Sequence, residues 1–269
     1  MNNEKQEVHD FWNQASCGEA LYLPCNDKAG YLAQAQARYE LEGRMIFDLA
    51  HFEEAKGMKV LEVGVGLGAD HQQFAEAGAD LYGIDLTERA IEHTRRRFAA
   101  FGLLSNLAVG DAENLDFPDN TFDQVYSWGV LHHSPNTAQA VAEVWRVLKP
   151  GGVASIMIYH KYSLVGLMLW VRYALLGLRP WLKLSDIYAH HMESPGTKAY
   201  SVAEARQLFS AFKEVQTQTL LSHGDLLESN AGQRHRGGLL TLARKIWPRW
   251  LIRRLFPYAG IFMLIEARK

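Results

Sequence analysis

The chain has 269 residues, of which 48% are hydrophobic and 22% are charged, and its formal net charge is −2. This length and hydrophobic content suffice for a large core in one α/β domain with appended segments, so two domains are not required. The only cysteines, Cys17 and Cys25, are too few for a disulfide framework and lack the clustered partners of a structural zinc site. We therefore expect neither a disulfide nor a bound metal.

Charge is unevenly distributed along the chain. The first ten residues, MNNEKQEVHD, are polar and acidic with no apolar run behind them, which indicates a cytoplasmic protein rather than a secreted one. From Gln233 to the end, nine Lys or Arg stand against one acid, Glu266, so this region carries +8 and the remainder −10. Such asymmetry favours an anionic partner or surface for the basic region, although a solvated helix face explains many basic runs.

Residues 4–50 precede the first predicted strand and are predicted to be helical, with aromatic residues spread among polar ones. They could pack on the sheet, or they could fold over its ligand as a cover. The second alternative defines residues 1–57 as an N-terminal helical cover.

A glycine-rich turn follows the first predicted strand. Residues 58–70, MKVLEVGVGLGAD, indicate a short buried strand, a turn with Gly64, Gly66 and Gly68, and the start of a helix that continues to Ala77. Glycine permits the backbone angles of so tight a turn and lets a ligand lie against bare backbone. The sequence therefore predicts a nucleotide-type binding loop.

Two carboxylates indicate what the loop could bind. Gly64, Gly66 and Ala69 fit the dinucleotide fingerprint G-x-G-x-x-G/A. Asp85 lies 21 residues beyond Gly64, about the spacing of a ribose-binding carboxylate. Glu62, just before the loop, would repel a pyrophosphate but suit a sulfonium or ammonium group. The alternative is that Glu62 is simply a strand-end carboxylate in water.

Strands and helices alternate beyond this loop. Further strands are predicted at Leu81–Asp85, Leu107–Asp111, Phe122–Trp128 and Gly152–Tyr159. Helices are predicted at Thr87–Phe101, with Thr87 as its cap, and at Thr137–Leu148, which ends before Pro150. Because strand and helix alternate, we expect a parallel sheet that is covered on both faces.

An apolar segment, Tyr162–Leu178, follows the fifth predicted strand and contains one charge, Arg172. A helix of this length would reach only about 25 Å, short of the roughly 30 Å hydrocarbon core of a bilayer. A mid-span arginine costs about 2.5 to 3.5 kcal/mol on insertion scales. We therefore reject a transmembrane span and predict a lid helix, within an insertion at about residues 160–200.

The remaining residues are predicted to complete the sheet. A helix is predicted at Ser201–Phe212, opened by a capping box of Ser201 and Glu204. The last two strands are predicted at Glu214–Ser222 and Gly260–Ala267, with a basic, aromatic insertion at about 223–257 between them.

Within that insertion, Pro248 is predicted to divide two short helices. Their apolar side would consist of Leu239, Leu242, Ile246, Trp250, Ile252 and Leu255, and their charge would come from Arg244, Lys245, Arg249, Arg253 and Arg254. These helices could pack on the domain with solvated arginines, or their basic face could rest on an anionic membrane.

Four segments in order resemble the class I S-adenosylmethionine-dependent methyltransferases, in their type 11 branch: VLEVGVGLGAD, GIDLT, VGDAENLDFPDNTFDQVYSWGVLHH and RVLKPGG. The resemblance covers residues 58–159, and FWNQASCG near the N-terminus is similar to a segment of one subgroup. It implies a Rossmann-like, doubly wound, seven-stranded sheet within residues 58–269, with the last strand antiparallel and with helical lid insertions.

The resemblance also implies the residues that would bind S-adenosyl-L-methionine. They are Glu62, Gly64, Gly66, Gly68, Asp85, Leu86, Asp111, Ala112, Glu113, Trp128 and Gly129. Glu62 would face the methionine part, and Asp85 would hold both ribose hydroxyls because a carboxylate accepts from two donors. Asp111 would accept from the adenine amino group, with the Ala112 backbone at the ring edge. The product would be S-adenosyl-L-homocysteine.

A sulfonium methyl group is already an activated electrophile, so the protein must mainly align a nucleophile and exclude water. A general base is needed only for a hydroxyl or a protonated amine. The candidates are His132, His133, Tyr159, His160, His190 and His191. We select His133, Tyr159 and His160 because the carboxyl ends of neighbouring strands converge on the pocket.

The predicted acceptor is a small, hydrophobic molecule, because the apolar lid implies a substrate cavity. The alternatives are a peripheral-membrane methyltransferase of lipids or quinones, a nucleic-acid methyltransferase and an NAD(P)-binding oxidoreductase. Nucleic acid is the less favoured partner, because no Asn-Pro-Pro-Tyr-type or Cys-based catalytic motif is present. The second acid, Asp111, and the residues after it argue against the oxidoreductase.

Overall fold

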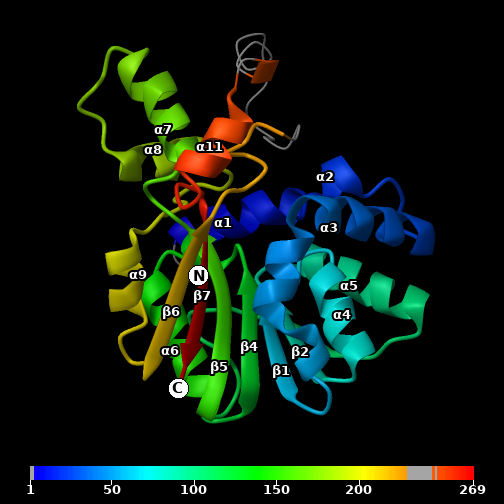
Figure 1. Ribbon diagram of the computed structural model, residues 1–269. Helices are drawn as coiled ribbons and strands as arrows, with labels where there is room; N and C mark the ends of the chain where they lie inside the picture. The colour runs from blue at the N-terminus through cyan, green and yellow to red at the C-terminus, as the bar shows by residue number, and fades with distance from the viewer. Residues whose placement is uncertain (1–2, 229–243, 246) are drawn as a thin grey trace.

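A seven-stranded sheet forms the centre of the computed structural model, which describes residues 3–228, 244–245 and 247–269 (Figure 1). The strands are β1 (Lys59–Val63), β2 (Asp80–Asp85), β3 (Asn106–Val109), β4 (Phe122–Trp128), β5 (Leu148–Tyr159), β6 (Glu214–Leu220) and β7 (Phe262–Arg268). They lie in the order β3-β2-β1-β4-β5-β7-β6. Strands β1 to β5 pair in parallel, whereas β7 is antiparallel to both β5 and β6. The predicted sheet with a reversed last strand is confirmed.

Helices cover both faces of this sheet, as the alternation of strand and helix predicted. Leu61 and Val63 of β1 pack with α6 (Thr137–Val147) and α9 (Val202–Leu208). Val60, on the opposite face, packs with α3 (Lys28–Ala50), α4 (Ala69–Ala77) and α5 (Glu88–Phe101). Because successive strand residues point to opposite faces, Glu62 shares the side of Val60 and faces α4.

Most predicted boundaries agree with the structure to within a few residues. The predicted caps are present: the Thr87 side chain accepts from Ala90 N, and Ser201 forms a capping box with Glu204. Strand β5 begins at Leu148 rather than Gly152, because Leu148 already pairs with Phe122 of β4. The third strand ends before Asp111, because that residue bridges Asn114 in the following turn.

The N-terminal region is helical, as predicted, and forms three helices. They are α1 (Asn3–Gln14), α2 (Glu19–Tyr22) and α3, and the short helix η1 (Phe52–Glu54) leads into β1. Gly18 interrupts the helical path with a φ of 74°, and Asp27 caps α3 by accepting from Gly30 N at 2.8 Å. Helices α1 and α3 cross the end of the sheet that is uppermost in Figure 1, where the parallel strands end.

A helical lobe stands above the same end of the sheet (Figure 1). It consists of α7 (Leu164–Trp170), a π-helical continuation η3 (Val171–Leu175), α8 (Leu184–His191) and α11 (Arg249–Leu255). The single helix predicted for Tyr162–Leu178 is thus α7 with η3, and α8 was not predicted. Pro248 precedes α11, as expected of a helix divider. Within the described part of the chain, every helix is too short or too polar to cross a bilayer.

Several predicted positions in the basic insertion lie outside the described residues. They are Arg234, Arg236, Leu239, Leu242 and Ile246.

Arg97 of α5 is 1% exposed and connects the N-terminal helices to the glycine loop. Its guanidinium donates to Gln72 Oε1 at 2.7 Å, to Gln34 Oε1 at 2.7 Å, and to the carbonyls of Leu67 and Tyr31 at 3.0 Å each. A buried guanidinium is stable only when its donors are satisfied, so these contacts hold α3, α4, α5 and the loop in one arrangement.

We expect Arg97→Met to lower the free energy of unfolding by about 3 kcal/mol, because it leaves several buried acceptors without their donor. Urea denaturation measures this change. The matched control is Arg96→Met on the same helix, where the side chain is half exposed and pairs with Glu92; its effect should stay within about 0.5 kcal/mol. Equal effects of the two substitutions would contradict the role given to Arg97.

Candidate functional site

The turn after β1 needs glycine at two positions for different reasons. Gly64 has a φ of 86°, and a Cβ there would lie 2.2 Å from Val130 Cγ2. Gly66 has a φ of 51°, and a Cβ there would meet no atom within 4 Å. The bare backbone at Gly66 therefore faces open space, which is the surface that a flat ligand needs.

Asp85 ends β2 beside this loop. Its Oδ1 accepts from Thr87 N at 3.0 Å and from Thr87 Oγ1 at 2.9 Å, and its Oδ2 accepts from Gly66 N at 3.2 Å. Burial raises the pKa of the Asp85 carboxyl, and these donated hydrogen bonds oppose that shift. The carboxylate is thus fixed in orientation, and each oxygen keeps lone-pair capacity for a further donor.

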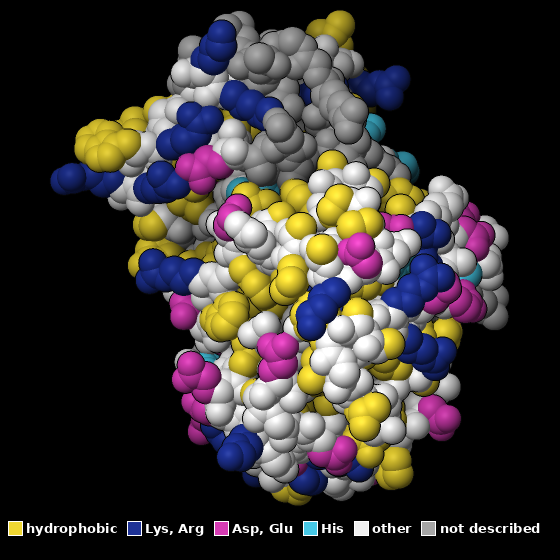
Figure 2. Space-filling model, turned by 90° about the vertical axis from the view of Figure 1, so that its right-hand side faces the viewer, with side chains coloured by type: hydrophobic (Ala, Val, Ile, Leu, Met, Phe, Trp, Pro, Cys, Tyr) yellow, Lys and Arg dark blue, Asp and Glu magenta, His cyan; other side chains and the backbone are white. Residues whose placement is uncertain are grey.

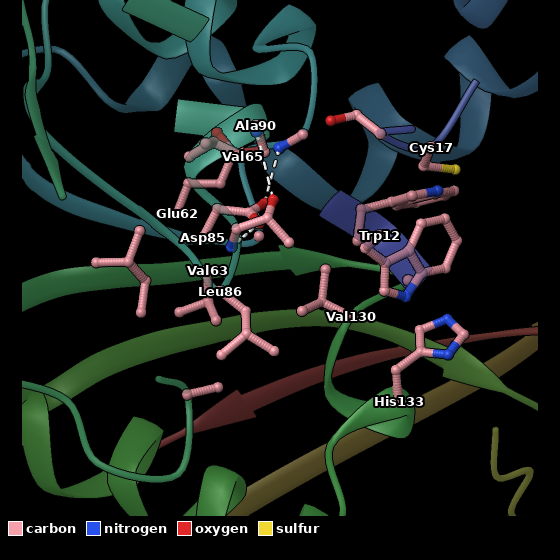
Figure 3. Close-up of a pocket in the computed structure, with 18 of the residues that line it drawn as sticks. Trp12, Cys17, Glu62, Val63, Val65, Asp85, Leu86, Ala90, Val130 and His133 are labelled. Carbon is pink, nitrogen blue, oxygen red and sulfur yellow. Dashed lines mark hydrogen bonds between the residues drawn. The ribbon is translucent and has the colours of Figure 1, made fainter. Parts of the chain in front are cut away.

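A pocket lies over the loop and the carboxyl ends of the parallel strands (Figure 3). It brings together most of the site residues predicted from the sequence: Glu62, Gly64, Gly66, Gly68, Asp85, Leu86, Asp111, Ala112, Trp128, Gly129, His133 and Tyr159. Two predicted residues, Glu113 and His160, are not among its lining residues.

Glu62 is buried at the floor of the pocket, and the water-exposed alternative is wrong. Its Oε2 lies 2.8 Å from His71 Nδ1, and His71 Nε2 lies 2.7 Å from Ser105 Oγ. Because Ser105 donates its hydrogen to the Leu81 carbonyl, its oxygen accepts from His71 Nε2. Burial raises the pKa of Glu62 and lowers the pKa of His71 to about 3. The pair is therefore neutral, with a protonated Glu62 donating to His71.

Asp70, at the start of α4, connects three elements around the pocket. Its carboxylate accepts from Arg38 Nη2 at 2.6 Å, Tyr39 Oη at 3.1 Å and Tyr126 Oη at 2.9 Å. Arg38 also lies 3.5 Å from Glu42, which accepts from Trp128 Nε1 at 3.1 Å. Arg38 and Glu42 therefore form part of the pocket wall with their charges compensated.

Helix α1 covers one end of the pocket. Lys5 Nζ lies 2.6 Å from Asp111 Oδ2 and 2.7 Å from Glu113 Oε2. Glu113 also accepts from Ser134 Oγ at 2.6 Å, so it anchors the cover instead of lining the pocket. Asp111 Oδ2, predicted to accept from an adenine amino group, thus has a cation beside it.

A second group of polar side chains lies at the opposite end of the pocket. His133, in the short helix η2 (Leu131–His133), has its Nδ1 2.8 Å from Ser194 Oγ and 3.1 Å from Thr197 Oγ1. Its Nε2 is buried without a hydrogen-bond partner among the described residues and lies 3.8 Å from Glu193 Oε2. Tyr159 donates to the same Glu193 oxygen at 3.0 Å.

Trp12 of α1 lies over this group. Its indole meets the His133 ring edge-on at a centroid distance of 5.4 Å, and Figure 3 shows the two rings together at one side of the pocket. Burial lowers the pKa of His133 to about 3, and the nearby charge of Lys198 acts in the same direction. His133 is therefore neutral near pH 7.

The other candidate histidines lie apart from this group or lack access to the pocket. His160 follows Tyr159 but points to the other side of β5, where its Nδ1 lies 3.1 Å from the Gly260 carbonyl. His132 is fully buried and lines neither cavity, and His190 is exposed on α8. His191 lines a second cavity.

This second cavity adjoins the first through shared wall residues, which are Cys17, Gln34, Arg38, Glu42, Tyr159, Glu193 and Phe262. Its further lining is largely apolar and aromatic, including Phe11, Leu21, Tyr22, Val165 and Leu169. Val165 and Leu169 come from the predicted lid segment. An apolar chamber therefore opens beside the end of the pocket that contains His133.

Lys5, Trp12, Arg38, Glu42 and Glu193 are among the pocket residues that the sequence reasoning missed. A signal existed for two of them, because Lys5, Val8 and Trp12 recur at the i, i+3, i+7 spacing of one helix face, and all three line the pocket. Arg38 and Glu42 are four residues apart on α3, a spacing that is equally common on solvated helices. Glu193 lies in an irregular segment and has no local signal.

Comparisons with known proteins agree with this geometry. Residues 61–156 match the family model described as a methyltransferase domain. The sterol 24-C-methyltransferase erg6 of Aspergillus fumigatus is 36% identical over 128 residues, which are 46% of this chain and 34% of that protein. The ubiquinone/menaquinone biosynthesis C-methyltransferase UbiE of Bordetella avium is 30% identical over 158 residues, which are 52% of this chain and 62% of that protein. The chain thus spans only part of the length of these relatives.

Solved structures share the fold over most of the chain. The 4+2 cyclase SpnF has a TM-score of 0.56 at 17% identity and covers 88% of this chain and 81% of its own. An S-adenosylmethionine-dependent methyltransferase of Mesorhizobium loti has a TM-score of 0.53 at 18% identity and covers 82% of this chain and 96% of its own. At these identities the likeness concerns the fold alone.

His132 provides a test of the buried polar cluster. Both its ring nitrogens are buried without hydrogen-bond partners among the described residues, and burial holds its pKa well below the ordinary value. In the unfolded protein His132 takes up a proton below its ordinary pKa of 6.5, whereas in the folded protein it stays neutral. Protonation therefore favours the unfolded state, and the free energy of unfolding decreases as pH falls. This contribution of His132 makes the free energy of unfolding about 2 kcal/mol smaller at pH 5 than at neutral pH.

We expect His132→Phe to reduce this acid-dependent loss by about 2 kcal/mol at pH 5. Urea denaturation at pH 5 and pH 7.5 measures the change, with His190→Phe on the exposed face of α8 as the control. Identical pH dependence of the wild type and His132→Phe would show that His132 titrates in the folded protein as it does in the unfolded one.

Proposed function

This chain belongs to the class I S-adenosylmethionine-dependent methyltransferases, in their type 11 branch, and we propose that it methylates a small, hydrophobic acceptor. The observation that carries the proposal is the single pocket in which the glycine loop and Asp85 lie at one end and His133 and Tyr159 at the other. The first group suits a nucleoside, and the second suits a polar group of an acceptor. The apolar second cavity supplies room for the rest of that acceptor.

The pocket fits S-adenosylmethionine, because Gly66 presents bare backbone and Asp85 presents oriented carboxylate oxygens. Asp85 would hold the ribose hydroxyls, and Asp111 with the Ala112 backbone would hold the adenine. Glu62, Trp128 and Gly129 line the part of the pocket assigned to the methionine moiety. When bound, the cofactor supplies a methyl group on a sulfonium, which needs no further activation.

Near the methionine moiety, the neutral Glu62–His71 pair can respond to charge. A ligand ammonium would favour the carboxylate form of Glu62, with its proton transferred to the adjacent His71 Nδ1. The carboxylate would then lie beside two cations, which compensates its burial.

His133 is proposed to orient the acceptor and take its proton. Thr197 Oγ1, whose hydrogen goes to the Ser194 carbonyl at 2.7 Å, can accept from His133 Nδ1, whereas Ser194 Oγ, 2.8 Å from Nδ1, can donate or accept. The proposal requires the tautomer with the imidazole proton on Nδ1, which leaves the Nε2 lone pair for an acceptor O–H or N–H. Because burial lowers the pKa of His133 to about 3, this proton transfer requires that Glu193, 3.8 Å from Nε2, stabilise the imidazolium that forms.

Residues 1–57 are proposed to act as a cover, as the sequence analysis suggested. Lys5, Val8 and Trp12 of α1 line the pocket, whereas Ile46 and Leu49 of α3 pack against the sheet. The region thus combines the two predicted roles, with α1 over the ligand and α3 in the core. A closed cover would exclude water from the reacting groups.

A second candidate function is methylation of a lipid or quinone drawn from a membrane, with peripheral contact. One observation favours it, because α7, whose Val165 and Leu169 line the second cavity, exposes Leu167 and continues into η3, which exposes Leu175. The sterol and quinone methyltransferases among the relatives are compatible with such an acceptor.

Asp85→Ala should weaken S-adenosylhomocysteine binding at least tenfold, because a hydrogen bond to a charged acceptor contributes about 1.5–3 kcal/mol. Isothermal calorimetry measures the affinity, and thermal melting verifies that the variant is folded. The control is Asp80→Ala, at the exposed start of the same strand. Unchanged affinity would remove Asp85 from the site. Absence of binding by the wild type, together with tight binding of a nicotinamide dinucleotide, would overturn the cofactor assignment.

Methyl-labelled S-adenosylmethionine, incubated with the protein and a cellular lipid extract, should yield label in the organic phase. His133→Asn should lower the rate about 100-fold or more, because the variant loses the proton acceptor. His190→Asn, on the exposed face of α8, should react like the wild type. Label transferred to added RNA or DNA but not to the extract would contradict a hydrophobic acceptor.

A further inference from the structure

The helical lobe exposes many large apolar side chains. Most of the exposed large hydrophobic residues among the described part of the chain belong to residues 162–181 and 250–258, and they are Tyr162, Leu167, Leu175, Leu176, Leu178, Trp181, Trp250, Leu251, Leu255, Phe256 and Tyr258. Leu178 is 82% exposed, Trp181 73% and Trp250 71%. Together with the basic residues described next, these side chains are called the lobe face. Exposed apolar groups in such density mark a contact surface.

The lobe face is basic and its segments contain no acid. Residues 162–185 and 244–265 include no Asp or Glu, and the exposed Asp186 of α8 directly follows the first of these segments. Their exposed cations are Arg172, Arg179, Lys183, Lys245, Arg253 and Arg254. Arg253 pairs with Glu228 at 2.6 Å, which offsets one of these charges. Figure 2 shows several dark blue side chains on the upper lobe, yellow ones at its left edge and little magenta, whereas dark blue and magenta side chains mix on the body below.

The two segments form one surface although they are far apart in sequence. Leu164 N donates to the Ala259 carbonyl at 2.9 Å, so the start of α7 adjoins the segment after α11. The buried Asp225 links both, because it accepts from Val165 N at 3.0 Å and its carbonyl accepts from Trp247 Nε1 at 2.9 Å. These contacts hold α7 beside α11, in agreement with their positions in Figure 1.

On their inner sides, α7, η3 and α8 pack against one another and form part of the wall of the second cavity. Leu169, Ala174 and Ile187 form a small buried cluster between α7, η3 and α8. Val165 and Leu169 also line the second cavity. The outward leucines and tryptophans are therefore additional to those that the fold needs for its own core.

We infer that the lobe face docks on the surface of an anionic lipid bilayer. Protruding leucines and tryptophans enter the interfacial region of a bilayer, and the surrounding arginines and lysines contact acidic headgroups. A nucleic acid would use the cations but offers nothing for Leu176 or Leu178 to enter, and an acidic protein partner would likewise leave the aliphatic tips in water. The inference rests on the proposed function in one respect, since docking would place the second cavity beside a source of hydrophobic acceptor.

Vesicle flotation tests this inference with the whole chain. Vesicles of phosphatidylcholine alone are compared with vesicles of equal phosphatidylcholine and phosphatidylglycerol, at low and at high salt. The wild type should float with the anionic vesicles at low salt and dissociate at high salt. The charge variant Arg179→Glu/Arg254→Glu should bind at least about 25-fold more weakly, since each basic group near the surface contributes about fivefold.

The apolar variant Leu178→Ser/Trp181→Ser should bind at least about tenfold more weakly because it removes two interfacial anchors. Leu104→Ser is the control for the apolar variant, because Leu104 is 91% exposed before β3. Arg44→Glu is the control for the charge variant, because the Arg44 side chain is 93% exposed on α3. Neither residue belongs to the lobe face. Both controls should bind vesicles like the wild type.

Equal, negligible flotation of the wild type with both vesicle types would overturn the inference. So would equal losses in the lobe-face and control variants, or lobe-face-dependent binding to RNA without binding to vesicles. S-adenosylhomocysteine affinity, measured by calorimetry on the same proteins, separates the two proposals. Normal affinity without flotation refutes docking alone, whereas flotation without affinity refutes the proposed function and leaves the docking surface supported.

Discussion

The buried carboxylate of Asp70 is the constraint on which the site depends. A charge removed from water must be compensated by hydrogen bonds, and Asp70 obtains them from Arg38, Tyr39 and Tyr126 on α3 and β4. Its place at the start of α4 adds the favourable field of a helix N-terminus. Breaking a buried ion pair costs about 3–5 kcal/mol, so the glycine loop, the N-terminal helices and the sheet keep one relative position.

The cofactor half of the site was predictable because its geometry is local. A strand, a glycine turn and a helix follow one another within 58–77, and Asp85 ends the adjacent strand in a predictable register. Residues at the ends of neighbouring parallel strands meet in space without any long-range information. The same logic placed Asp111 and Trp128 at the pocket, and the alternation of strand and helix yielded the parallel direction of the first five strands.

The part of the pocket around His133 and Tyr159 could not be predicted to the same depth, since it depends on how distant segments fold together. Tyr159 and His160 were both selected at the end of one strand, yet side chains alternate across a sheet and only Tyr159 reaches the pocket. Glu193 reaches Tyr159 through an irregular segment that has no periodic pattern. Glu113 was assigned to the cofactor by its neighbours in sequence, but the turn directs its carboxylate toward Lys5.

Helix α1 contacts both ends of the pocket within its 12 residues, a rod about 18 Å long. Lys5 contacts Asp111 at the nucleoside end, and Trp12 contacts His133 at the acceptor end. If α1 moves as a rigid helix, a movement that separates Lys5 from Asp111 also changes the position of Trp12 relative to His133. The two ends of the pocket are therefore mechanically linked through α1.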